Sequence, residues 1–363
     1  MFLRIIINTD LFFTVPESTT PELVFERSLY MIKDEHLRVL TVDEFDELYP
    51  KYKDELLATE EYWLCWKDPE NESASLAYHT TRSQSKWNSP KKPGLATARC
   101  FVRPVLTANK EVFTPGDMYT IGTDLFKLPL RWQAIKADML MCCECPTVYQ
   151  LSSIGFSDEP NDPFEVTNVY HFLNNEFAPS AFTPLEWSAI RKGDFFEYLK
   201  PYTGEIEISP SVTEVPEERY HSDTALIKLH ILPRTQPLKI CKNAFSYSDL
   251  QEVTGMEYIS EIKARAFYMA NICGSLTFGD VRIGGKAFEK NNIETLSFDG
   301  TVSSVQAHAF SQNQISDIVC NGAILELGQA AFSGNHIQQN VAEKVLNSVF
   351  LAYCDDAFDD QDI

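Results

Sequence analysis

Hydrophobic residues recur at a fixed period in the last third of the chain. Ala-Phe pairs stand there at intervals of 22, 21, 22 and 22 residues. Their phenylalanines are Phe245, Phe267, Phe288, Phe310 and Phe332. An aliphatic residue stands five positions before each Phe and another five positions after it, as Ile283 and Ile293 do around Phe288. Because such a unit can bury its apolar face only by stacking on its neighbours, the pattern predicts a solenoid.

Each unit also contains a short run that predicts one strand. The runs 293–298 and 315–320 place apolar members toward the core, so the polar residues between them line an exposed ladder, where solenoids usually meet partners. The candidate protein-binding residues on this ladder are Glu294, Thr295, Ser297, Ser316 and Asp317. Asn291, Asn313 and Asn335 stand where the chain turns into the strand, and an Asn side chain can satisfy turn amides.

The combined pattern I-x-x-x-A-F-x-x-N-x-I-x-x-L resembles the BspA-like leucine-rich repeats of bacterial surface and secreted proteins and of some protists and phages. The resemblance covers about residues 238–340, and the first two units depart from it with Ser248 and Ala270 where Asn is expected. It implies protein or glycan binding by a non-enzymatic scaffold, and it does not indicate the partner.

A capping helix is expected after the repeats. Residues 340–343 have the Asn-x-x-Glu form of a capping box, and Val341, Val345 and Val349 with Leu346 and Phe350 form a one-sided stripe. The acidic tail at 355–362 is expected to add charge and to fray.

The first 235 residues predict mixed α+β structure with antiparallel sheets and short helices. Strands are expected at 61–66, 76–79, 99–106, 116–122, 130–135 and 139–142, with a loop at 88–94. Helices are expected at 166–177 and from Thr183, where Pro184 and Glu186 follow a Thr cap, and a long loop at 203–218. The predicted parts are an α+β domain at 1–112, a second domain or permuted half at 113–235, five repeats at 236–340, and a helix with tail at 341–363.

Several pieces of this region resemble an uncharacterised bacterial domain often found beside such repeats. They include 116–122 with Trp132, 172–177 and 101–106, but their order differs from the family's, which indicates a permuted domain or two tandem copies. The Tyr-Trp and Val-Arg-Pro pieces also look like the C-type-lectin-like fold, which implies ligand display by loops. The candidate contacts are then Tyr62, Trp63, Trp66 and Trp87, and the alternative is that these aromatics form a core.

Net charge and cysteine content limit the expected partners and cellular location. The chain carries a formal net charge of −21, so nucleic acid is not an expected partner, because a polyanion requires clustered Lys and Arg. The N-terminus has no signal-peptide form and no stretch is apolar enough to cross a membrane. With 9 cysteines in no paired pattern, reduced thiols and a cytoplasmic or virion location are expected.

Catalytic and metal motifs are missing from the sequence. The Cys-x-x-Cys spacing of Cys142 and Cys145 lacks a second ligand pair, so a buried strand end is favoured over zinc. We therefore expect no cofactor, no metal and no enzyme activity. The expected function is protein binding through the repeat face, in a phage or bacterial structural or recognition protein that self-associates in a larger assembly. The alternatives are an intracellular inhibitor or adaptor that captures a host protein, and an enzyme with an unrecognised site.

Overall fold

The computed structural model describes residues 104–143 and 171–361, short stretches at 36–38, 63–67, 75–80, 91–93, 99–100 and 154–155, and the single residues 40, 44, 47 and 48. The chain divides into two compact units. The first contains residues 1–125 and 129–202, and the second contains residues 126–128 and 203–363. The second unit therefore begins before residue 236, where the repeat pattern set its start.

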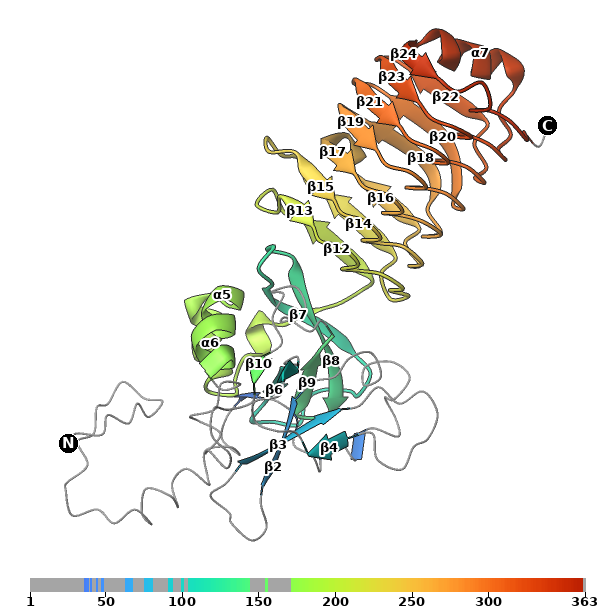
Figure 1. Ribbon diagram of the computed structural model, residues 1–363. Helices are drawn as coiled ribbons and strands as arrows, with labels where there is room; N and C mark the ends of the chain where they lie inside the picture. The colour runs from blue at the N-terminus through green and yellow to red at the C-terminus, as the bar shows by residue number, and fades with distance from the viewer. Residues whose placement is uncertain are drawn as a thin grey trace, which may run out of the picture. The chain divides into compact units, whose positions relative to one another are not determined.

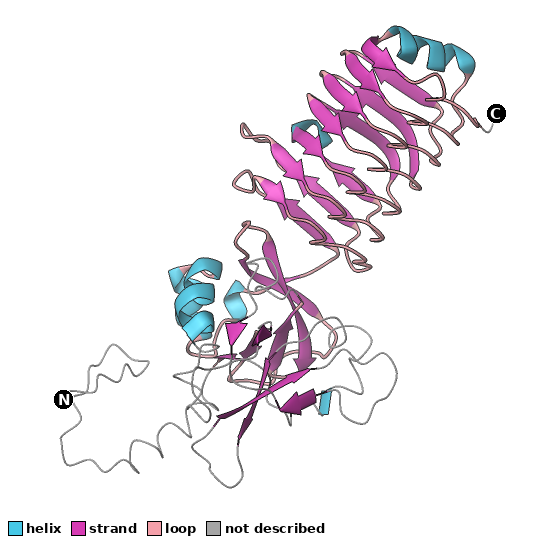
Figure 2. Ribbon diagram, viewed as in Figure 1, coloured by secondary structure: helices cyan, strands magenta, loops and turns pink. Residues whose placement is uncertain are grey.

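A six-stranded antiparallel sheet forms the centre of the first unit (Figures 1 and 2). In spatial order its strands are β1 (Leu37–Arg38), β6 (Val105–Thr107), β9 (Met139–Cys142), β8 (Pro129–Lys136), β7 (Met118–Thr123) and β11 (Lys200–Pro201). The three strands expected between residues 116 and 142 are confirmed as β7, β8 and β9. Because β6 pairs with β9, the sheet crosses the boundary expected at residue 112.

Two smaller antiparallel sheets belong to the same unit. One contains β2 (Trp63–Lys67), β3 (Ser75–Thr80) and β4 (Lys91–Pro93), and the other pairs β5 (Arg99–Cys100) with β10 (Ile154–Gly155). The single strand expected at 99–106 is thus divided between β5 and β6, which belong to different sheets. The expected loop at 88–94 contains β4, because its backbone pairs with β3.

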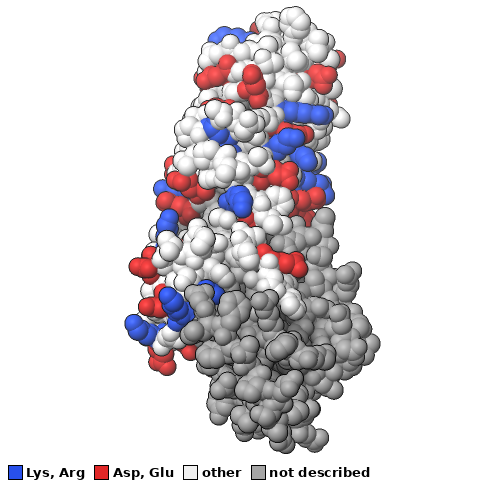
Figure 3. Space-filling view, turned by 90° about the vertical axis from the view of Figure 1, so that its left-hand side faces the viewer, with Lys and Arg blue, Asp and Glu red and all other residues white. Residues whose placement is uncertain are grey.

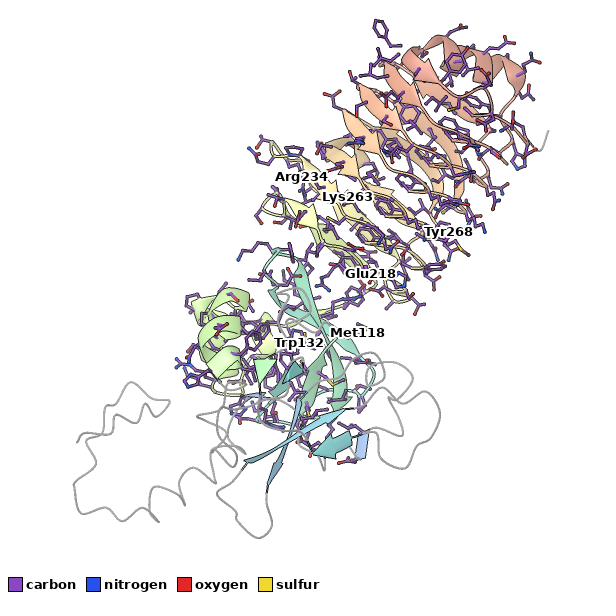
Figure 4. The ribbon with its side chains drawn as sticks, in the orientation of Figure 1. Met118, Trp132, Glu218, Arg234, Lys263 and Tyr268 are labelled. Atoms are coloured by element: carbon purple, nitrogen blue, oxygen red, sulfur yellow. The ribbon has the colours of Figure 1, made fainter. Side chains whose placement is uncertain are left out.

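Short helices pack on the main sheet of this unit. They are a π-helical turn at Phe172–Phe177, α5 (Ala178–Ala181), α6 (Pro184–Ile190) and a 3-10 turn at Phe196–Tyr198. The predicted cap of α6 is confirmed: Glu186 donates its backbone N–H to Thr183 Oγ1 at 3.3 Å, and Glu186 Oε2 accepts from the Thr183 N–H at 2.7 Å. Trp132, labelled in Figure 4, is fully buried and donates its indole N–H to the Ile121 carbonyl at 3.0 Å.

The second unit is a solenoid of parallel strands, as predicted (Figure 1). One side carries β12 (Glu205–Ile208), β14 (Lys228–Ile231) and β16 (Glu252–Thr254), then β18 (Cys273–Phe278), β20 (Asn292–Phe298) and β22 (Asp317–Cys320). The other carries β13 (Glu214–Val215), β15 (Leu238–Ile240), β17 (Ile259–Ile262), β19 (Val281–Ile283), β21 (Val302–Val305), β23 (Ile324–Leu327) and β24 (Val349–Tyr353), and a 3-10 turn spans Met256–Tyr258. The loop expected at 203–218 is wrong, since β12 and β13 begin the solenoid there.

A column of stacked aromatic rings runs through the core of the solenoid. Successive rings are Tyr220, Phe245, Phe267, Phe288, Phe310, Phe332 and Phe358, with centroids 5.0 to 5.5 Å apart. The five predicted phenylalanines are fully buried. Tyr220 and Phe358 extend the column by one ring at each end. The acidic tail therefore contains a further turn of the solenoid, in which Ala357 is also fully buried.

A ladder of buried amide side chains runs beside the rings and joins neighbouring coils. Asn313 Oδ1 accepts the Ile293 N–H at 3.2 Å, while Asn313 Nδ2 donates to the carbonyls of Phe288 at 2.8 Å and Phe310 at 3.0 Å. Asn291 and Asn335 make the corresponding bonds one coil away on either side. In the last turn Gln361 takes this place, with bonds to Ile337, Phe332 and Phe358. The predicted turn role of the asparagines is confirmed and reaches across coils.

The turn around each ring from Tyr220 to Phe332 contains two residues in the left-handed backbone region. They stand two positions before and two positions after the ring, as His308 (φ 57°) and Gln312 (φ 56°) do around Phe310. Most of these positions carry a side chain, although an L-residue there costs about 1–2 kcal/mol relative to the right-handed region. Around Phe332 the two positions are Ala330 (φ 46°) and Gly334 (φ 68°).

Opposite substitutions at these two positions are expected to have opposite effects. Ala330→Gly should raise the free energy of unfolding by about 0.5 kcal/mol, because the gain from removing Cβ exceeds the entropy cost of glycine. Gly334→Ala should lower the free energy of unfolding by about 1 kcal/mol, because the φ of Gly334 is positive. The nearest atom to an added Cβ would be Gln312 Cγ, at 3.3 Å, so the backbone conformation accounts for most of this cost. Urea denaturation followed by circular dichroism measures both. Equal signs for the two variants would contradict the argument.

The C-terminal end differs from the predicted cap. Helix α7 spans Gln339–Asn347, and its N-cap is Gln338, with no side-chain hydrogen bond to the helix end. The capping box expected at 340–343 is therefore wrong, because Asn340 lies inside the first turn. Val349 and Phe350 do not continue the helical stripe but belong to β24, which pairs with β23 in parallel. Among the described residues, no helix is long and apolar enough to span a bilayer.

Candidate functional site

The predicted ladder residues lie on the three-stranded sheet β18-β20-β22. Thr295 is in register with Ser275 and Asp317, and Ser297 is in register with Thr277 and Val319. Leu296 and Phe298, which alternate with them, are buried. Glu294, Ser316 and Asp317 are exposed, and Thr295 and Ser297 are half-buried. The structure thus places the predicted residues on one solvent-facing surface, while their role in binding stays a prediction.

Several ladder side chains bind each other. Thr295 Oγ1 donates to Ser275 Oγ at 2.5 Å, and Ser297 Oγ donates to Asp299 Oδ1 at 2.6 Å. Asn321 Nδ2 donates to the same carboxylate at 2.9 Å. The hydrogen bond from Ser297, followed by that from Asn321, lowers the pKa of Asp299 below its ordinary value. This surface is therefore a network of small polar groups that already have partners.

Charged side chains alternate in sign from coil to coil on the sheet β12-β14-β16 and on the seven-stranded sheet. Lys228 lies between Glu205 and Glu252, with Nζ to carboxylate distances of 3.6 and 3.4 Å. The hydrogen bond and charge of Glu252, followed by the charge of Glu205, raise the pKa of Lys228. In the other sheet one register row contains Glu214, Lys239, Glu261 and Arg282. Figure 3 shows basic and acidic side chains interspersed over the solenoid, so the charges in this view mainly neutralise their neighbours.

A cluster of large side chains lies on the ring-bearing edge of the first coils. Tyr247 contacts Tyr268 edge to face, with centroids 5.3 Å apart, and contacts the His221 ring at 5.6 Å. The Arg265 guanidinium lies 5.9 Å from the centre of the Tyr268 ring. Tyr247 is 49% exposed and Met269 is 38% exposed. These five residues are the corner patch, and Figure 4 shows its Tyr268 on the solenoid edge that also carries Glu218.

The position of the corner patch follows from the repeat. Tyr247 (φ 59°) and Met269 (φ 51°) occupy the left-handed position two residues after the ring, where the side chain points to solvent. In later coils Lys290, Gln312 and Gly334 stand at this position. Tyrosine and methionine at this position depart from the repeat, and this departure marks the patch in the sequence. The sequence analysis considered only the polar ladder and did not identify the patch.

The described residues do not show whether the aromatic candidates of the first unit lie close together. Tyr62 and Trp87 lie outside the described residues. Trp63 and Trp66 lie in β2, where their backbones are in register with His79 and Leu76, and their side chains are not described. The lectin-like display of these residues stays a prediction.

The Cys-x-x-Cys segment begins in the main sheet. Cys142 is the last residue of β9 and is fully buried, as expected for a strand end, while Cys145 lies outside the described residues. Within the described stretches, no group of three or more His, Cys, Asp or Glu side chains is arranged to hold a metal ion.

The solenoid can now be compared with known proteins. The family model of the BspA-type leucine-rich repeat region matches in 6 copies, over residues 188–276 and 238–350. Curated proteins gave no match to this chain. The match covers the coils that carry the rings from Tyr220 to Phe332, including those that precede residue 238, and it ends before Phe358. The solenoid of this chain is therefore a BspA-type leucine-rich repeat region.

Proposed function

We propose that the chain is a non-enzymatic scaffold that binds another protein through the corner patch of its leucine-rich repeats. Repeats of this type are a protein-binding or surface-recognition scaffold, which supports the general role. The observation that carries the choice of surface is the contact of Tyr247 with Tyr268 beside Arg265, next to the exposed Met269. We extend the proposal to a structural or recognition protein of a phage or bacterium, from the distribution of such repeats.

The corner patch fits a protein interface better than the predicted ladder does. Protein interfaces are enriched in Tyr, Met and Arg, and a few such residues supply most of the binding energy. The ladder carries Ser, Asp and Glu, which are depleted from interfaces, and its Thr295 and Ser297 already have hydrogen-bond partners. Tyr247 and Met269 are also held in fixed turns, which reduces the entropy lost on binding.

Removing the two tyrosines is expected to abolish partner capture. In affinity purification from the host lysate, with quantitative mass spectrometry, the double variant Tyr247→Ser/Tyr268→Ser should retain about tenfold less of the partner or worse, as for loss of interface hot spots. Both side chains lie outside the core, so the fold is retained. The matched control is Glu294→Ala/Thr295→Ala on the ladder, which should capture the partner as the unaltered chain does.

The opposite pattern would reject the patch. Retention by the tyrosine variant and loss by the ladder variant would place recognition on β20. Capture that is equal for all three proteins would place it away from both surfaces. For the biological context, sedimentation of the captured complex with particles of high mass is expected for a structural role, whereas a small soluble complex with one cytoplasmic protein would favour an inhibitor or adaptor.

A further inference from the structure

The two sheets that reach the C-terminal end of the solenoid, β18-β20-β22 and the seven-stranded sheet, end differently. Helix α7 contacts β22, the last strand of the sheet β18-β20-β22, and also contacts β24, which follows it in the chain. The seven-stranded sheet ends with β24, and among the described residues no further strand pairs with it. Figure 1 shows β24 as the final strand beside α7. One sheet is thus capped by a helix, and the other ends in a strand edge.

The sequence of β24 lacks the features that usually protect such an edge. Phe350 is 79% exposed, Leu351 65% and Tyr353 51%, and no charged residue or proline occurs between Val349 and Tyr353. Exposed edge strands in soluble proteins are normally short, charged or interrupted, because their backbone groups otherwise pair with another strand. The apolar β24 edge therefore fits an added strand.

We propose that β24 pairs with β24 of a second copy of this chain, antiparallel about Leu351. This register places Phe350 opposite Ala352 of the second copy and Val349 opposite Tyr353, so aromatic and aliphatic side chains meet across the two strands. Such cross-strand pairs are favourable, and no like charges face each other within the pairing. The symmetry is two-fold, which closes the assembly at a dimer.

Charge favours the antiparallel arrangement over a parallel one. Asp355, Asp356, Asp359 and Asp360 follow β24 closely. In a parallel pair the acidic segments of both copies would lie side by side. In the antiparallel pair Asp355 of one copy lies roughly 25 Å from Asp355 of the other, at about 3.3 Å per residue, which exceeds a Debye length of about 8 Å.

Head-to-tail stacking of solenoids is a poorer solution. It would pair β24 with the opposite edge of the same sheet, which is formed by β13. That strand contains only Glu214 and Val215, so it offers 2 residues against the 5 of β24. Pairing of β24 with itself uses the full length of the apolar edge.

The test compares the purified full chain with a charged edge variant. Analytical ultracentrifugation over a concentration series should show a monomer–dimer equilibrium for the unaltered protein. Leu351→Lys places two like charges on the two-fold axis and should raise the dimer dissociation constant about tenfold or more. The matched control is Leu185→Lys in α6, a leucine that is 69% exposed and lies away from the edge, and it should leave the dissociation constant unchanged.

Hydrogen exchange measured on the same samples shows whether β24 forms the dimer interface. Amides of residues 349–353 should exchange more slowly at concentrations at which the dimer forms, and this protection should be absent in Leu351→Lys. An unaltered chain that stays monomeric throughout the series, or a Leu351→Lys variant that dimerises equally well, would overturn the proposal. A monomeric chain that loses a different bound protein on Leu351→Lys would also overturn it and assign the edge to a foreign strand. The tyrosine variant of the corner patch should dimerise normally, which separates this result from the proposed function.

Discussion

Replacing Asn313 with alanine is expected to lower the free energy of unfolding of the solenoid by about 2–4 kcal/mol. The substitution removes the acceptor of the buried Ile293 N–H and one of the two amide donors that the carbonyls of Phe288 and Phe310 each have. An unsatisfied buried polar group costs about 1–3 kcal/mol, and a hydrogen bond lost from a group that keeps another partner costs about 0.5–1.5 kcal/mol. Asn291 and Asn335 still donate to these two carbonyls. Their side-chain oxygens already accept from Ile272 and Ile315, so the Ile293 N–H is the group left without an acceptor.

Urea denaturation followed by far-ultraviolet circular dichroism measures this loss. The matched control is Asn321→Ala, which removes an exposed amide bound to Asp299 and should change the free energy of unfolding by less than about 0.5 kcal/mol. Because solenoids can unfold in parts, hydrogen exchange of the Ile293 amide is measured as well. Equal effects of the two substitutions would show that the buried ladder contributes no more than a surface amide.

Replacing Phe288 with alanine is expected to cost about 3–5 kcal/mol, the range found for large-to-small core substitutions. The ring stacks on Phe267 and Phe310 with centroid distances of 5.0 Å on both sides and meets Phe278 edge to face at 5.7 Å. The cavity cannot collapse easily, because the Phe288 backbone is fixed by the N–H that it donates to the Ala309 carbonyl.

The position of a phenylalanine in the column should set the size of its effect. Phe358→Ala should cost less than Phe288→Ala, since its ring stacks on Phe332 alone among the described rings of the column. Phe350→Ala is the exposed control and should change the free energy of unfolding by less than about 0.5 kcal/mol. Denaturant midpoints measured under one condition for all three variants check this order. If Phe358→Ala lowered the free energy of unfolding as much as Phe288→Ala does, ring stacking would not be the source of the stability.

Much of the solenoid was predictable because its core repeats in the sequence. The Ala-Phe pairs and the aliphatic residues around them specify ring stacking and strand direction locally, and the asparagines indicate the turns. The first and last coils of the solenoid were not predicted, because their residues differ from the repeat pattern. Tyr220 replaces Phe at the start, and Gln361 replaces Asn at the end, although both side chains make the same contacts as the residues they replace.

The candidate surfaces were less predictable than the core. The polar ladder of Thr295 and its neighbours was found from strand alternation, because burial of one strand face requires exposure of the other. The corner patch was missed, since Tyr247 and Tyr268 are 21 residues apart in the chain and meet only when two coils stack.

The sequence by itself determined the repeat, its ring column and its exposed strand face, because each coil uses the same short-range pattern. Only the tertiary structure decided where the solenoid begins and ends, which large side chains gather at its corner, and that β24 rather than the capping helix closes one sheet. These features depend on contacts between coils and on what lies beyond the last coil. No local pattern records such contacts, whereas burial and hydrogen bonding in the folded chain do.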